Sequence, residues 1–150
     1  MKYLKTIFAV PISILIIFAA SQSYASETPS GVVAEFCKLD FESHRLSSAA
    51  YVPIEPLIMY LAEPGWDIVL GVHSYELSSE TIEGNIAKVI VHYEIDRSWP
   101  VDIGEISKYK TETFMLAQEN GFWKISKYIQ FPRVSSELLC SKYKYCTTGS

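Results

Sequence analysis

The sequence predicts an α+β domain, in which helices near the amino terminus pack on a strongly curved antiparallel sheet of about four long strands. Three observations support this prediction. A segment with apolar residues at helical spacing comes first, four segments with the composition of strands follow it, and turn signals separate the strands. A chain that places its helices ahead of a run of strands typically gathers them on one face of an antiparallel sheet.

The first helix is predicted from residue 29 onward by its start signal and its apolar spacing. Thr28 or Ser30 can cap the helix, and Pro29 is well tolerated in a first turn. One face then carries four residues at helical spacing, namely Val33, Phe36, Cys37 and Asp40. Polar residues interrupt this pattern at 43–47, so we expect the helix to end there.

A short second helix is predicted over residues 57–62. Pro53 and Pro56 each disfavour helical backbone at the preceding residue, so no helix runs through 51–56. The apolar residues after Pro56 favour a helix, which Glu63-Pro64-Gly65 would end in a turn.

Four strands are predicted over residues 67–77, 86–95, 106–118 and 122–131. The second has the clearest pattern, because apolar residues occupy every second position: Ala87, Val89, Val91, Tyr93 and Ile95. Gly71 predicts a bulge or bend in the first strand. Gly84-Asn85 and Asn120-Gly121 mark hairpin turns. Pro132 ends the fourth strand, and a short helix is expected near 135–141.

The amino terminus has the pattern of a secretory signal peptide. Lys2 and Lys5 precede an apolar run over residues 6–20, and Ser23-Tyr24-Ala25 supplies the small residues of a cleavage site. A retained anchor is the alternative, but the run is shorter than the roughly 20 residues that a bilayer needs. We therefore expect cleavage after Ala25, a periplasmic or secreted protein with no membrane span, a single domain over 26–136, and a tail over 137–150.

Charge and cysteine content limit the classes of partner. The formal net charge is −4, and removal of Lys2 and Lys5 with the leader would lower it to −6. An acidic chain without a basic cluster is a poor nucleic-acid binder. An oxidising compartment permits one disulfide among Cys37, Cys140 and Cys146. Either Cys140–Cys146 forms locally or Cys37 ties the first helix to the tail; a disulfide that tethers the tail is favoured, and its connectivity stays open. The spacing of these thiols predicts no metal site and no cofactor.

Three places in the sequence carry a resemblance to a known family. They are Pro64-Gly65-Trp66-Asp67 leading into Tyr75-Glu76-Leu77, the strand from Ala87 to Tyr93, and Gly121-Phe122-Trp123-Lys124-Ile125 followed by Pro132-Arg133-Val134-Ser135. In these features the chain resembles the nuclear transport factor 2-like superfamily, which includes SnoaL-like and ketosteroid-isomerase-like proteins. The resemblance implies a cone-shaped fold in which a bent sheet wraps a long helix and leaves a pocket at the open end. Because that fold serves isomerases, dehydratases, transport factors and pure binding domains, it assigns no function.

Three residues are candidates for catalysis: Asp40, His73 and Tyr75. Asp40 lies on the apolar face of the first helix, where a carboxyl in a dry pocket has a raised pKa and can act as a base. The alternative is a structural role, with Asp40 bonded to backbone or to Arg45 at the helix end. His73 shares a strand face with Tyr75 and can shuttle protons if that face lines the pocket, whereas a strand histidine is otherwise a surface residue. His92 faces away from Tyr93 and is expected to point outward.

The ten tyrosines and three tryptophans suggest an aromatic pocket. Aromatic rings can bind an apolar ligand while their polar atoms fix its orientation. The candidates for such a lining are Tyr51, Tyr60, Trp66, Tyr93 and Tyr109. Ordinary strand packing is the alternative, since strands favour aromatic residues.

These observations predict an exported, non-catalytic binding module with an aromatic-lined pocket between the first helix and the sheet. Its expected partner is a small apolar ligand or a peptide, and a homodimer through the sheet is expected from the mixed polarity of the second sheet face. Two alternatives remain open. One is an isomerase- or dehydratase-like enzyme that uses a pocket aspartate and tyrosine, and the other is an immunity or assembly factor that acts through protein contacts.

Overall fold

A computed structural model describes residues 28–60, 66–99 and 107–143 of the chain. The predicted signal peptide and its cleavage site lie outside the described residues, as does Cys146. Among the described residues, no helix has the length and apolar character that crossing a bilayer requires.

Helix α1 (Pro29–Phe41) begins as the sequence predicts. The Thr28 Oγ1 accepts a hydrogen bond from the backbone N–H of Gly31 at 3.1 Å, and Pro29 occupies the first turn. The helix ends at Phe41, and Ser43, just after the cap residue Glu42, adopts a left-handed conformation with φ 71°. Three short helical turns follow: η1 (His44–Leu46), α2 (Ser48–Tyr51) and η2 (Glu55–Leu57).

The predicted second helix over 57–62 is wrong for the part of it that the structure describes. Ile58 has extended backbone, with φ −123° and ψ 155°, and it pairs in parallel with Ile125. The Met59 N–H donates to the Ile125 carbonyl oxygen at 2.9 Å. The extended backbone is favoured over a helix for two reasons. Leu57 and Ile58 are buried in the core, and the free edge of the strand that ends at Ile125 provides a hydrogen-bond partner for the backbone.

In the described part of the chain, the sheet contains five strands in the order β4-β3-β2-β1-β5. They are β1 (Val69–Glu83), β2 (Ile86–Trp99), β3 (Tyr109–Glu119), β4 (Phe122–Ile125) and β5 (Arg133–Ser135), and helix α3 (Ser136–Tyr143) follows them. Neighbours pair antiparallel except β1 and β5, which are parallel. The prediction of an α+β fold is thus confirmed, whereas the prediction of four antiparallel strands is wrong: the sheet is mixed.

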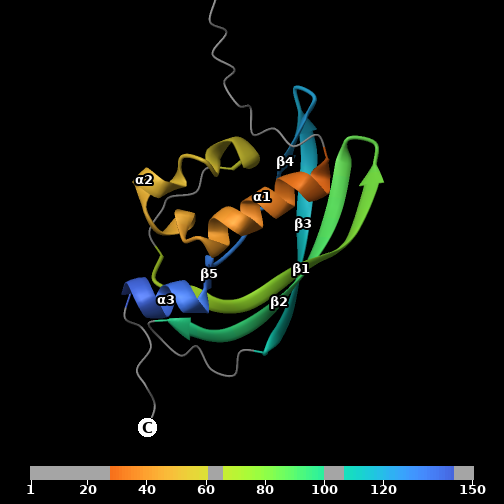
Figure 1. Ribbon diagram of the computed structural model, residues 1–150. Coiled ribbons are helices and arrows are strands. Elements are labelled where there is room, and N and C mark those ends of the chain that lie inside the picture. Colours follow the sequence, from red (N-terminus) through yellow and green to blue (C-terminus); the bar gives the residue numbers. More distant parts are fainter. Residues whose placement is uncertain (1–27, 61–65, 100–106, 144–150) are drawn as a thin grey trace, which may run out of the picture.

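The difference arises where the predicted fourth strand breaks. Pairing with β3 stops at Ile125, and the chain then crosses to the opposite edge of the sheet, where Arg133, Val134 and Ser135 pair with Leu70, Gly71 and Val72. A short connection can join the two edges because the sheet curls into a half-barrel around α1, which brings the edges closer together (Figure 1). We call residues 126–132 the crossing segment.

Strand β2 has the alternation that the sequence predicts. Its five apolar odd positions are buried, while Lys88 and His92 on the other face are exposed. Gly71 lies at a register shift, as expected, and a Cβ there would lie 3.1 Å from the Ser136 Oγ. The β3–β4 hairpin turns at Asn120 and Gly121, both with positive φ, which confirms the tight turn.

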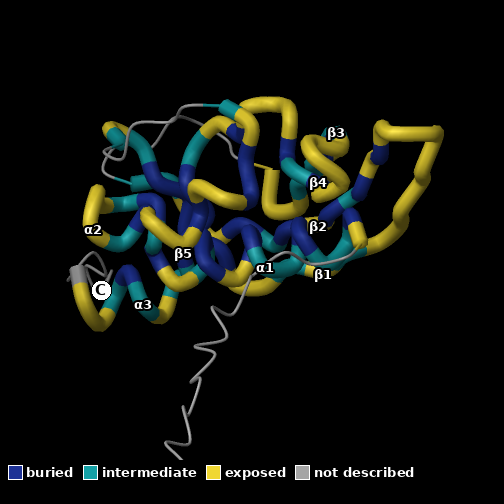
Figure 2. The backbone as a smooth tube through the Cα atoms, turned by 90° about the horizontal axis from the view of Figure 1, so that it is seen from above, coloured by how far each residue is buried: buried dark blue, intermediate teal, exposed yellow. Residues whose placement is uncertain are grey.

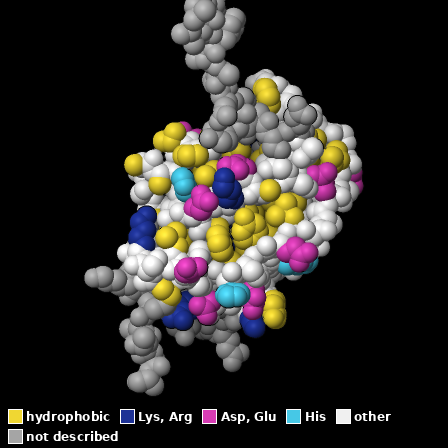
Figure 3. Space-filling view, in the orientation of Figure 1, with side chains coloured by type: hydrophobic (Ala, Val, Ile, Leu, Met, Phe, Trp, Pro, Cys, Tyr) yellow, Lys and Arg dark blue, Asp and Glu magenta, His cyan; other side chains and the backbone are white. Residues whose placement is uncertain are grey.

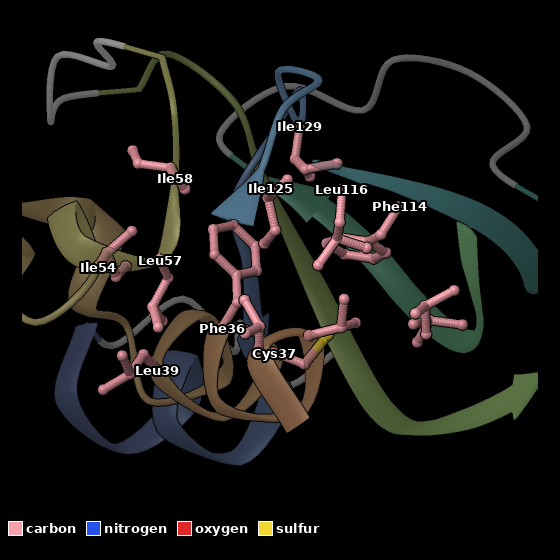
Figure 4. Packing of buried hydrophobic residues seen from close by; sticks show 14 of the residues in the cluster. Phe36, Cys37, Leu39, Ile54, Leu57, Ile58, Phe114, Leu116, Ile125 and Ile129 are labelled. Atoms are coloured by element: carbon pink, nitrogen blue, oxygen red, sulfur yellow. The ribbon is translucent and has the colours of Figure 1, made fainter. Parts of the chain in front are cut away.

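The core fills the space between α1 and the concave face of the sheet. Figure 2 shows buried backbone where α1 meets the strands, and Figure 4 shows the side chains that meet there. The Phe36 ring packs edge-on against Phe114, with ring centroids 5.7 Å apart. Leu57, Ile125 and Ile129 close the cluster from other elements. A second, smaller cluster of Val69, Val134 and Leu139 attaches α3 to the sheet.

Candidate binding site and the buried polar network

Asp40 lies in the last turn of α1 and is about 1% exposed. Its Oδ2 accepts a hydrogen bond from the Arg45 Nη1 at 3.1 Å, so the pair is a buried salt bridge. Burial raises the pKa of the Asp40 carboxyl, and the positive charges of Arg45 and Arg133 oppose that shift. This geometry corresponds to the structural alternative for Asp40, in which its carboxyl is held by Arg45.

Arg45 anchors the crossing segment. Its Nη2 donates to the carbonyl oxygens of Ile129 at 2.6 Å and Gln130 at 3.2 Å, and its Nη1 donates to that of Phe131 at 3.3 Å. The planar guanidinium lies 5.5 Å from the centroid of the Phe36 ring and 4.7 Å from that of Trp66. A single arginine therefore ties α1, the turn after it and the crossing segment together.

Arg133 forms a second buried anchor. Its Nη2 pairs with the Glu112 carboxylate of β3, and its Nη1 donates to the Phe131 carbonyl oxygen at 3.1 Å. The guanidinium lies 4.9 Å from the centroid of the Tyr93 ring. The Tyr93 hydroxyl is 3.1 Å from the Cys37 Sγ, and burial raises the pKa of Tyr93 well above its ordinary value. Two polar contacts, Arg133 with Glu112 and Tyr93 with Cys37, thus lie on either side of the Tyr93 ring, while the buried Arg133 Nε has no hydrogen-bond partner among the described residues.

A pocket of about 390 Å³ lies between the segment that follows α2 and the β3–β4 hairpin. We call it the tyrosine pocket; its lining is Tyr51, Glu55, Ile58, Met59, Tyr60, Glu119 and Lys124. The pairing of Ile58 with Ile125 sets the distance between its two walls. The Tyr60 hydroxyl accepts a hydrogen bond from the Ile129 N–H at 3.4 Å, and Lys124 pairs with Glu119 across the hairpin.

The structure brings two of the five predicted pocket aromatics together and separates the other three. Tyr51 and Tyr60 share the tyrosine pocket. Trp66 stacks on Tyr128 at 5.8 Å and donates from its Nε1 to the Arg45 carbonyl oxygen. Tyr93 is buried in the core, and Tyr109 is 67% exposed at the start of β3. The tyrosine pocket lies beside the β3–β4 hairpin, away from the predicted position between α1 and the sheet.

The two catalytic candidates on β1 lie apart from Asp40. His73 is exposed and lines a surface depression of about 520 Å³ with Glu94, Ile95, Asp96 and Lys108. Tyr75 is half-buried, and its ring packs edge-on against Phe41 at 5.4 Å. Neither residue contacts the tyrosine pocket, and sequence reasoning missed Glu55 and Lys124, which do line it.

Several large apolar side chains are exposed. Ile82 and Ile86 lie near the tip of the β1–β2 hairpin, which projects from the body of the molecule (Figure 2). On the face of the molecule that is turned to the viewer in Figure 1, hydrophobic side chains gather near the centre, and acidic side chains lie around this group (Figure 3). A homodimer through the sheet and a protein-interaction role both stay predictions.

Two of the three cysteines, Cys37 and Cys140, lie in the described part of the chain. Cys37 carries a free, buried thiol, so no disulfide ties α1 to the tail. The local pairing of Cys140 with Cys146 stays a prediction, because Cys146 lies outside the described residues. Within 28–60, 66–99 and 107–143, no three histidine, cysteine or acidic side chains are arranged to hold a metal ion.

Comparison with protein-family models, with curated proteins and with solved structures finds no match for this chain. The resemblance to the nuclear transport factor 2-like superfamily therefore stays a prediction.

Burial of Cys37 and Tyr60 predicts a loss of stability at alkaline pH. Burial raises the pKa of Cys37 from 9.0 to about 12 and that of Tyr60 from 10.0 to about 12. The unfolded chain releases these protons at the lower, ordinary values, so rising pH favours unfolding across this window. We expect the free energy of unfolding in urea to hold up to about pH 9 and to fall between about pH 9 and 12.

The double variant Cys37→Ala with Tyr60→Phe is the control for this prediction. It removes both ionisable groups while keeping most of the buried apolar volume, so its stability should fall less steeply over the same pH range. An equally steep fall in the double variant would assign the alkaline loss to other groups.

Proposed function

We propose that this protein is a non-catalytic binding module whose ligand occupies the tyrosine pocket. The observation that carries the proposal is the contrast between two regions. The interior between α1 and the sheet is filled by the core and by the buried ion pairs of Arg45 with Asp40 and of Arg133 with Glu112, whereas an open pocket of about 390 Å³ lies beside Ile58. A volume at the lower end of the range for ligand pockets suits a small molecule.

The lining supports binding of a partly apolar molecule. Ile58, Met59 and the tyrosine rings provide apolar contacts. The charged groups of the lining belong to Glu55, Glu119 and Lys124. Rigid aromatic walls bind with little loss of side-chain entropy. Tyr60 is fixed at both ends, because its hydroxyl bonds to Ile129 and its ring packs edge-on against Tyr128 at 5.3 Å.

The position of Asp40 supports a binding role over catalysis. A general base must reach its substrate directly or through one water molecule. Asp40 is held by Arg45 and does not line the tyrosine pocket. We also propose that the module acts after export, since the predicted leader of residues 1–25 precedes the domain at 26–136.

Met59→Trp is expected to abolish ligand binding while preserving the fold. Met59 is 43% exposed and lines the pocket, so a larger ring can fill the pocket with little effect on the core. The measurement is a thermal-shift screen with small aromatic and aliphatic compounds. Compounds that raise the melting temperature of the wild-type protein should have no effect on Met59→Trp.

Val52→Trp is the matched control. Val52 is 61% exposed and does not line the pocket, so this variant should respond to ligands as the wild type does. If no compound stabilises the wild type, or if Met59→Trp responds fully, the pocket is not the binding site and the proposal fails.

A further inference from the structure

We propose that the tyrosine pocket binds a small organic cation, namely an ammonium group carried on an apolar body. This inference rests on the function proposed above and adds the chemical class of the ligand. Three features of the pocket support it: the charge of its lining, the aromatic rings of Tyr51 and Tyr60, and the apolar side chains of Ile58 and Met59.

The charged groups of the lining favour a cation over an anion. Glu55 and Glu119 contribute two carboxylates and Lys124 one ammonium group. Lys124 is already paired with Glu119, whereas Glu55, among the described residues, forms no ion pair. A bound cation would therefore meet an uncompensated carboxylate, and an anion would meet only a cation that is already neutralised.

The aromatic walls add a second attraction for positive charge. The faces of Tyr51 and Tyr60 are negative because of the ring quadrupole, and a desolvated ammonium group gains free energy over such a face. The protein itself uses this interaction nearby, where the Arg45 guanidinium lies 4.7 Å from the centroid of the Trp66 ring. Ile58 and Met59 then leave an apolar surface for the body of the ligand.

The buried positive charge of Arg45 acts on both tyrosines, and it opposes a bound cation. Its charge is partly offset by the Asp40 carboxylate at 3.1 Å, which acts on both tyrosines with the opposite sign but more weakly than Arg45. On the pocket wall itself, Glu55 is the charged residue that forms no ion pair within the described part of the chain, whereas Arg45 does not line the pocket.

The experiment compares three probes with one skeleton, phenylpropylamine, phenylpropanol and phenylpropionate, by amide chemical-shift titration. The amine should shift the amides of Met59 and Lys124 and bind about fivefold more tightly than the alcohol, with the carboxylate weakest. Glu55→Gln should reduce the preference for the amine over the alcohol, leaving only the smaller part that the tyrosine rings supply. Glu83→Gln, which removes an exposed carboxylate outside the pocket, should leave both affinities unchanged.

The outcomes separate this inference from the proposed function. If the alcohol shifts the pocket amides and binds as tightly as the amine, the pocket does not select a cation and the inference is overturned, while the pocket stays the binding site. If Glu55→Gln leaves the preference for the amine unchanged, the Glu55 carboxylate does not select the cation, and the inference as argued from the charge of the lining is overturned. If no probe shifts the amides of Met59 and Lys124 at about 10 mM, both proposals fail.

Discussion

Arg45→Ala is expected to lower the free energy of unfolding by about 4 kcal/mol or more, which is the largest effect we predict for a single substitution. The change leaves the Asp40 carboxylate buried without its 3.1 Å partner. It also removes the donor for the carbonyl oxygens of the crossing segment and the cation that lies between Phe36 and Trp66. Since domains of this size are stable by only about 5–15 kcal/mol, this loss would be a large fraction of the total stability.

Urea unfolding followed by circular dichroism measures this loss. Arg97→Ala is the matched control, because Arg97 forms an exposed ion pair with Asp96 and should cost less than about 1 kcal/mol. Arg45→Lys should also be strongly destabilising, since one ammonium group cannot reproduce the planar fork of donors. A loss in Arg45→Ala as small as that in Arg97→Ala would show that the crossing segment is held by other contacts.

Local patterns in the sequence predict the elements that depend on neighbouring residues. The cap at Thr28, the alternation in β2 and the turn at Asn120-Gly121 each depend on short-range geometry, and the structure agrees with all three. The parallel pairing of β5 with β1 could not be predicted in this way. Residues 122–131 alternate like one long strand, and the break after Ile125 becomes favourable only when the sheet curls and Arg45 binds the carbonyl oxygens of the crossing segment.

The candidate site was predicted in part for a similar reason. The aromatic content of the sequence identifies Tyr51 and Tyr60 as candidates. The apolar residues after Pro56, however, indicate a helix, which would orient the Tyr60 side chain differently from the observed extended segment. The extended backbone at Ile58 depends on the free edge of β4, and that edge is a feature of tertiary structure. Glu55 and Lys124 have no periodic signal, since isolated charges in a turn and on a short strand are ordinarily solvated.

Phe36→Ala is expected to lower the free energy of unfolding by about 3–4 kcal/mol. Phe36 is about 1% exposed and lies at the centre of the core between α1 and the sheet (Figure 4). The change opens a cavity, removes the edge-on contact with Phe114 at 5.7 Å, and removes one of the two rings beside the Arg45 guanidinium. Urea unfolding again measures the loss.

Two further substitutions separate the contributions to that loss. Phe36→Leu keeps most of the apolar volume but not the ring, so it should cost about 1–2 kcal/mol, and its difference from Phe36→Ala reports mainly the cavity. Phe122→Ala removes a phenylalanine that is 52% exposed and should change stability by less than about 1 kcal/mol. If Phe36→Ala costs no more than Phe122→Ala, α1 is not packed in the concave face of the sheet. The crossing segment and the tyrosine pocket would then lack the support from which their geometry follows, because Arg45 and the core residues around Ile125 and Ile129 hold both in place.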